Sequence, residues 1–214
     1  MRAAFLTAGA AVLAIAWFSP LPDLAPESFA AHMTMHMAVV AVAAPCLALA
    51  IAGSTADPVR ALHWLAAPIQ ASMIEFVVVW SWHAPALHHA ARHETWALAV
   101  EQGSFLAAGL FLWIAAFGGD RAQRRVRAGA GVVGLLFTSM HMTLLGALFA
   151  LANRSLFSHE AHASSLADQH LGGAIMLLVG GMSYLLGGLW LTAGMLGTGR
   201  PTSAPASIVR PEAS

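Results

Sequence analysis

One stretch of the chain combines histidine and methionine at helical spacing. In the run His32-Met33-Thr34-Met35-His36-Met37, His32 and His36 are four residues apart, as are Met33 and Met37. In a helix, each of these pairs lies on one face. Imidazole and thioether together suit copper, whereas zinc rarely takes a thioether ligand. The alternative is that the methionines fill gaps between helices and the histidines face water.

A second stretch, Met140-His141-Met142, repeats this combination inside an apolar segment. A histidine near the centre of a bilayer needs a partner within the bundle. His141 is therefore either a polar packing residue or a metal ligand, and its flanking methionines favour a ligand. Met142 joins Met33 and Met37 as a candidate soft auxiliary ligand.

Carboxylates also fall within apolar stretches. At 1.5 Å per residue, His36, Glu75 and Glu101 lie about 7–10 Å below the outer ends of their helices. Glu75 and Glu101 are candidates to bind a metal, orient an imidazole, balance an ion's charge or hold a proton. The alternative for each is a protonated group that hydrogen-bonds a neighbouring helix.

Other polar residues flank the apolar stretches on the same side. Asp168 is either a helix cap or an outer ligand together with His170, and His83 belongs to the outer rim or supports the ligands. The remaining histidines of this side are expected to be solvated or to scavenge metal at the surface; they are His88, His89, His93, His159 and His162.

The composition excludes most soluble classes. Of 214 residues, 58% are hydrophobic and 9% are charged, with a mean hydropathy of +0.70. A soluble domain carries about 25% charged residues, so much of this chain must lie in lipid. Ten basic and ten acidic residues balance, which disfavours nucleic-acid binding. No hydrolase, phosphate-loop or dinucleotide motif occurs, and we expect no enzymatic turnover.

The apolar stretches predict an all-α polytopic membrane bundle of about six helices. These lie near residues 3–18, 31–52, 64–82, 96–117, 129–152 and 171–196. Residues 1–196 form one transmembrane domain, and residues 197–214 form a disordered cytoplasmic tail. A helix needs about 20 residues to cross a bilayer. The first stretch is shorter and is either a cleaved signal or, as we favour, an uncleaved helix.

The arginines set the predicted orientation. With the N-terminus and C-terminus inside, eight arginines are cytoplasmic, and only Arg92 and Arg154 are outside. Nine of the eleven histidines then lie at or near the outer face. This pattern predicts a site facing the periplasm of a bacterial inner membrane.

Several of these residues also carry a family resemblance. The chain resembles the CtaG-like integral membrane assembly factors of caa-type cytochrome c oxidase. The shared stretches are residues 32–37, Trp82-His83-Ala84-Pro85-Ala86-Leu87, Glu101 with Ser104-Phe105, His141-Met142 through Leu145-Gly146-Ala147, and Asp168-Gln169 through Leu171-Gly172-Gly173.

The resemblance implies a protein that matures a haem-copper oxidase by handling or delivering copper at the outer face. The family pattern carries over to His32, His36, His83, Glu101, His141 and Asp168. Three features depart from that pattern. Gln102 stands where a histidine usually follows the glutamate, Cys46 stands where a second proline is frequent, and six helices replace seven.

We therefore expect a copper-handling assembly factor whose partners are oxidase subunits or another copper chaperone. His32, His36 and His141 are its expected ligands. One alternative is an electron carrier with b-type haem between His36 and His141. Another is a copper or proton transporter that uses Glu75, Glu101 and His141. Glycines 173, 180 and 187 predict close helix packing, and a homo-oligomer through them stays open.

Overall fold

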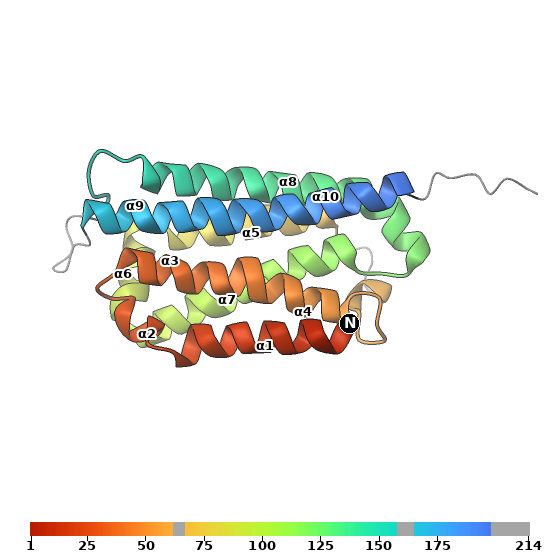
Figure 1. The fold of residues 1–214 in the computed structure, drawn as a ribbon, viewed down its shortest axis with the longest axis horizontal. Coiled ribbons are helices and arrows are strands. Elements are labelled where there is room, and N and C mark those ends of the chain that lie inside the picture. The colour runs from red at the N-terminus through yellow and green to blue at the C-terminus, as the bar shows by residue number, and fades with distance from the viewer. Residues whose placement is uncertain (62–66, 158–164, 198–214) are drawn as a thin grey trace, which may run out of the picture.

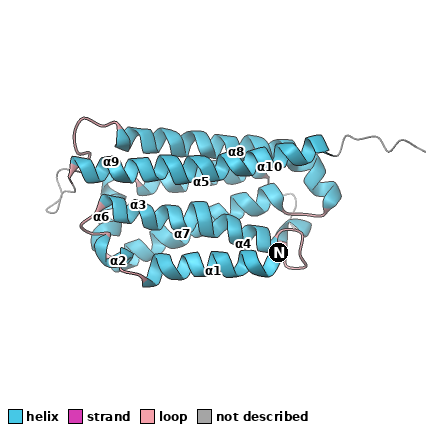
Figure 2. Cartoon of the chain, viewed as in Figure 1, coloured by secondary structure: helices cyan, strands magenta, loops and turns pink. Residues whose placement is uncertain are grey.

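The computed structural model describes residues 1–61, 67–157 and 165–197, and these residues form helices without any strand. The helices pack side by side along one long axis (Figures 1 and 2). The elements are α1 (Arg2–Phe18), α2 (Leu21–Leu24), α3 (Phe29–Met37), η1 (Ala38–Ala43), α4 (Ala44–Ile51), η2 (Pro58–Arg60), α5 (Pro68–Trp82), α6 (Pro85–His93), α7 (Thr95–Phe117), α8 (Arg121–Ala150), α9 (Leu166–Ile175), η3 (Met176–Gly180) and α10 (Gly181–Gly197). The all-α class predicted from the sequence is confirmed.

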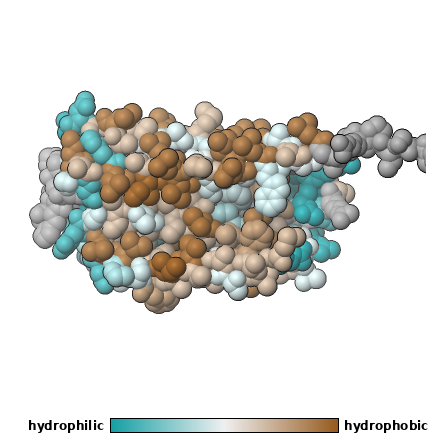
Figure 3. Space-filling model, viewed as in Figure 1, coloured by the Kyte–Doolittle hydropathy of each residue, from teal (hydrophilic) through white to brown (hydrophobic). Residues whose placement is uncertain are grey.

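Four continuous helices are long and apolar enough to cross a bilayer. They are Phe29–Ile51, Thr95–Phe117, Arg124–Ala150 and Leu166–Leu196, and the shorter helix Arg2–Phe18 is also apolar. Helix α5 has 15 described residues, and Trp64 lies outside the described range. A hydrophobic band covers the middle of the molecule between hydrophilic ends (Figure 3). The chain is thus a membrane protein, and six spans remain a prediction.

Two long helices begin earlier than the apolar pattern indicates. Helix α8 starts at Arg121 rather than near residue 129, and the arginines and alanines of this added stretch have high helix propensity. Helix α9 starts at Leu166 rather than near residue 171, because Ser165 caps it by accepting the Asp168 N–H at 3.1 Å. Polar helix ends therefore project past the predicted apolar limits.

A π-helical segment, η1, interrupts the helix that carries the histidine pair. Pro45 has no N–H, so it leaves the Ala41 carbonyl without its usual helical donor. The Ser183 hydroxyl donates to that carbonyl at 2.6 Å, and the Tyr184 hydroxyl lies 3.4 Å from the Val40 oxygen. Helix α10 thus supplies hydrogen-bond donors to the backbone carbonyls that the proline leaves unpaired. It also fixes the C-terminal half of the Phe29–Ile51 span.

The N-terminus and the start of α8 lie at the end of the bundle opposite α6 (Figure 1), and these segments contain most of the described arginines. Arg2 donates to the Gly53 carbonyl at 2.9 Å, and Arg127 donates to the Ala115 carbonyl at 2.9 Å. Buried Asp57 accepts the backbone N–H groups of Gly53 and Gly119, which joins two neighbouring loops. This basic end therefore lies a full bundle length from the start of α3.

Glycines allow the last span to approach its neighbours closely. A methyl group at Gly173 would lie 2.4 Å from the Ala150 nitrogen and 2.7 Å from the Gly146 oxygen. A methyl group at Gly187 would lie 2.5 Å from the Trp113 ring. The predicted packing role of these glycines is confirmed within this chain.

Replacing Gly173 with alanine should destabilise the bundle. The added methyl group meets rigid backbone of α8, and such overpacking costs about 1–3 kcal/mol. Thermal unfolding of the protein in detergent measures the effect. Gly103→Ala is the matched control, because a Cβ at Gly103 contacts nothing within 4 Å. A Gly173→Ala protein as stable as this control would contradict the close packing of α8 and α9.

Candidate metal centre

The start of α3 is fixed by a residue from α9. The Ser28 hydroxyl caps α3 by accepting the Ala31 N–H at 3.1 Å. Asp168 accepts the Ser28 hydroxyl at 2.9 Å, the Phe29 N–H at 2.6 Å and the Ala30 N–H at 3.3 Å. Asp168 therefore caps α3 from the first turn of α9, whereas the sequence suggested a cap of its own helix, which Ser165 provides.

Two histidines of α3 converge on one carboxylate of α7. The Nε2 atoms of His32 and His36 each lie 3.3 Å from Oε1 of Glu101. The three side chains are at most 1% exposed, and their ligand atoms lie within 4.8 Å of one another. We call these three residues the His–Glu centre. In the sequence, Glu101 follows His32 by 69 positions and His36 by 65 positions.

The spacing within the His–Glu centre suits a small transition-metal ion. Two ligands that are each about 2 Å from a tetrahedral metal are separated by about 3.3 Å. The two nitrogen–oxygen distances have this value. The centre thus has ligand types that a bound ion can use, and two of its three separations match that geometry.

Gln102 supports one of the two histidines. Its amide nitrogen lies 2.6 Å from Nδ1 of His36, and the side chain is buried. Rotating the amide by half a turn places its oxygen there to accept Nδ1–H, which leaves the lone pair on Nε2. Metal-bound histidines are usually oriented by such a hydrogen bond. Gln102 is therefore placed to orient the His36 ring.

His83 and His88 adjoin the His–Glu centre. The His83 ring centroid lies 5.8 Å from that of His36, and the His88 centroid lies 5.2 Å from that of His32. Nδ1–H of His83 donates to the Val79 carbonyl at 2.7 Å, so Nε2 carries its lone pair. Burial lowers the pKa of His83 to about 3 and that of His88 well below its usual value. Both imidazoles are neutral at pH 7.

The prediction that His88 is exposed was wrong. His88 is fully buried, and its ring packs 4.1 Å from Phe157 and 5.6 Å from Phe29 between centroids. Helix α6 turns His88, Ala91 and Arg92 inward, which is a helical i, i+3, i+4 pattern. That pattern, after a proline at the helix start, is the signal that was missed. His89 and His93 are exposed as predicted, while His159 and His162 lie outside the described residues.

Met33 and Met37 face a different side of α3 from the histidines, and Met142 of α8 lies near Met37. A Cβ at Gly172 would lie 3.1 Å from Cγ of Met33, and one at Gly180 would lie 3.3 Å from Sδ of Met37 and 3.6 Å from Cβ of Met142. All three methionines are buried. They thus pack against α9 and η3, whereas His32 and His36 meet Glu101 on α7.

Three other candidate residues have separate surroundings. His141 packs against Phe76 and Phe137, at centroid distances of 5.3 and 5.6 Å. Glu75 accepts the Tyr184 hydroxyl at 2.5 Å, and His170 lies 2.9 Å from the Ala152 carbonyl through Nε2. None of these is among the three clustered ligand residues, and His36 and His141 have different ring neighbours.

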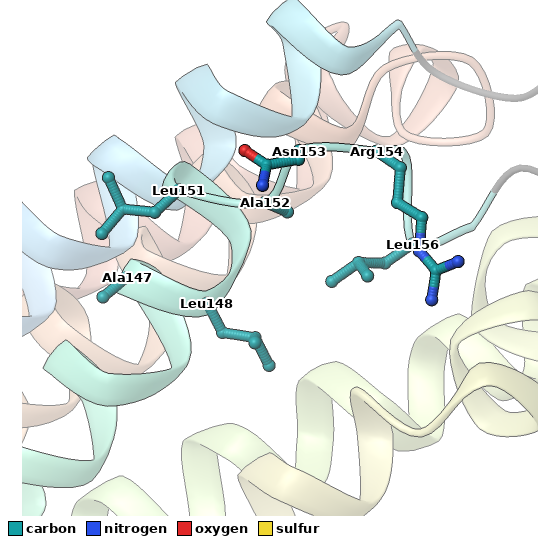
Figure 4. A pocket seen from close by; sticks show the side chains of 7 residues that line it. All are labelled: Ala147, Leu148, Leu151, Ala152, Asn153, Arg154 and Leu156. Carbon is teal, nitrogen blue, oxygen red and sulfur yellow. The ribbon is translucent and has the colours of Figure 1, made fainter.

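A surface hollow lies at the end of α8, at the end of the bundle that carries α6 (Figures 1 and 4). Its volume is about 480 Å³, and its lining combines apolar side chains with Asn153 and Arg154. The lining residues are Ala147, Leu148, Leu151, Ala152, Asn153, Arg154 and Leu156. The hollow therefore shares no residue with the His–Glu centre.

Comparison with known proteins agrees with the resemblance seen in the sequence. Residues 1–197 match the family model of the cytochrome c oxidase caa3 assembly factor, Caa3_CtaG. Searches of the curated proteins and of the solved structures found no match. The family model spans every described helix, including those that build the His–Glu centre. The chain belongs to the Caa3_CtaG family of cytochrome c oxidase assembly factors.

Proposed function

We propose that this protein binds one copper ion at His32, His36 and Glu101 and passes it on during oxidase assembly. The observation that carries the proposal is the convergence of two imidazole nitrogens on one buried carboxylate oxygen. The role is that of a carrier without turnover. Oxidase subunits or another copper chaperone are its proposed partners.

Unsatisfied polar atoms support a bound ion. Within the described part of the chain, Oε2 of Glu101 and Nε2 of His36 are buried without a hydrogen-bond partner. Leaving buried polar groups unpaired costs about 1–3 kcal/mol each. An ion at the centre gives such lone pairs an acceptor and offsets the carboxylate's charge. The cost of burial is then recovered when the protein is loaded.

The choice of copper rests on the ligands together with the family. A pair of histidines with one glutamate also suits zinc, so the ligand set alone leaves both metals open. Imidazole sites bind Cu²⁺ more tightly than Zn²⁺. The family serves a cytochrome c oxidase, and the haem-copper oxidase implied by the resemblance needs copper. These arguments together favour copper as the cargo.

The position of the centre supports delivery on the outer side of a bacterial plasma membrane. The start of α3 lies at the opposite end from the arginine-bearing start of α8 (Figure 1). Arginine-rich segments stay in the cytoplasm. The His–Glu centre is accordingly proposed to face the periplasm.

His36→Ala should abolish stoichiometric copper binding, because it removes one of three ligands and the residue that Gln102 orients. Elemental analysis of protein purified from copper-supplemented cells measures this. His141→Ala, another buried histidine outside the cluster, should retain about one copper per chain. Equal copper in wild type and His36→Ala, or zinc in place of copper in the wild type, would refute the proposed site.

Glu101→Gln should weaken copper binding by at least about 10-fold, the lower end of what is lost when even a supporting group of a metal site is removed. Competition with a Cu(I) or Cu(II) chelator of known affinity gives the dissociation constant. Glu75→Gln is the matched control, since Glu75 is also buried in a helix but contacts Tyr184. The proposal fails if both variants bind copper with the same affinity as wild type.

Deleting the gene should lower the copper content of the assembled oxidase, and His36→Ala should reproduce that loss in cells. Glu75→Gln, which leaves the ligands in place, should restore oxidase copper. The ratio of copper to haem in the purified oxidase measures the effect. An unchanged ratio of copper to haem in the deletion strain would show that the oxidase receives its copper without this protein.

A further inference from the structure

Two buried histidines remain outside the proposed ligand set. Among the described residues, Nε2 of His83 and both ring nitrogens of His88 are buried without a hydrogen-bond partner. The side chains are 8% and 0% exposed. Such imidazoles are costly to bury, and their rings lie nearly parallel with centroids 6.5 Å apart. Packing alone does not explain two unpaired imidazoles side by side.

Their place in the fold is between the aqueous phase and the His–Glu centre. His88 lies on α6, a helix whose opposite face exposes His89 and His93. Phe157, from the segment after α8, covers the His88 ring. Each of the two histidines then contacts one ligand of the centre, since His88 lies beside His32 and His83 lies beside His36.

We propose that His83 and His88 form a second binding position, which a copper ion occupies in transit from the outer aqueous phase to His32, His36 and Glu101. This inference rests on the proposed function and adds the route by which the centre is loaded. The imidazoles supply lone pairs in turn, so the ion exchanges one metal–nitrogen bond for another. No oxidant or reductant takes part.

The ligands and their charges explain why a copper ion leaves His83 and His88 and does not stay bound there. In the described structure only His32, His36 and Glu101 bring three ligand atoms within 4.8 Å. His83 and His88 offer two nitrogens and no carboxylate. An ion therefore gains a third ligand and a compensating charge when it moves on to Glu101. The direction of transfer follows from that difference.

The test compares how fast and how fully the protein loads. Metal-free protein in detergent is mixed anaerobically with a coloured Cu(I) chelate, and loss of the chelate's absorbance is followed by stopped flow. In His88→Gln and in His83→Gln, we expect loading at least tenfold slower with the same final copper content. His89→Gln, the exposed neighbour on α6, should load at the wild-type rate.

The outcomes distinguish the two proposals. Wild-type protein that takes up no copper contradicts the proposed function itself. Wild-type uptake with unchanged rates in both glutamine variants overturns only the transit position. A lower final copper content in both variants also overturns it, because the histidines would then be permanent ligands. Equal slowing by His89→Gln would assign the effect to the surface of α6. If gel filtration shows that one variant misfolds, the other decides.

Discussion

Glu101 lies between two imidazoles at a depth where the bundle excludes water, and this contact constrains the surrounding helices. A carboxylate and two histidines are tolerated there because they meet one another. Their convergence requires α3 and α7 to pack in one register. The carboxylate of Asp168 fixes the start of α3, and Gln102 holds the His36 ring. The neighbouring structure thus positions a small polar centre in an apolar bundle.

Much of this arrangement follows from simple patterns in the sequence. Apolar stretches located the long helices, and the four-residue spacing of His32 and His36 placed both on one face. The predicted depth placed Glu101 at the same level as His36. It placed Glu75 at that level too, but Glu75 pairs with Tyr184 instead. Depth gives a residue's height along the helix axis and not the neighbour that it faces. The partner of each buried carboxylate therefore had to come from the structure.

Helical spacing predicted which residues share a face more reliably than adjacency in the sequence did. Successive residues of a helix point about 100° apart, so Met33 and Met37 turn away from the face that carries His32 and His36. They meet the glycines of α9 and η3. His88 is the opposite case. Its sequence position suggested an exposed loop residue, but α6 turns its side chain into the bundle. Short amphipathic helices between spans are hard to separate from loops, since they contain too few residues to establish a period.

The cap that Asp168 provides for α3 also has a consequence for biosynthesis. His32 and His36 leave the ribosome long before Glu101, and Asp168 follows a further 67 residues later. The nascent chain therefore has no complete His–Glu centre until α7 has been synthesised, and no anchored α3 until α9 has docked. A polypeptide truncated between these points lacks the fixed geometry. The complete and anchored His–Glu centre is in this way reserved for finished molecules.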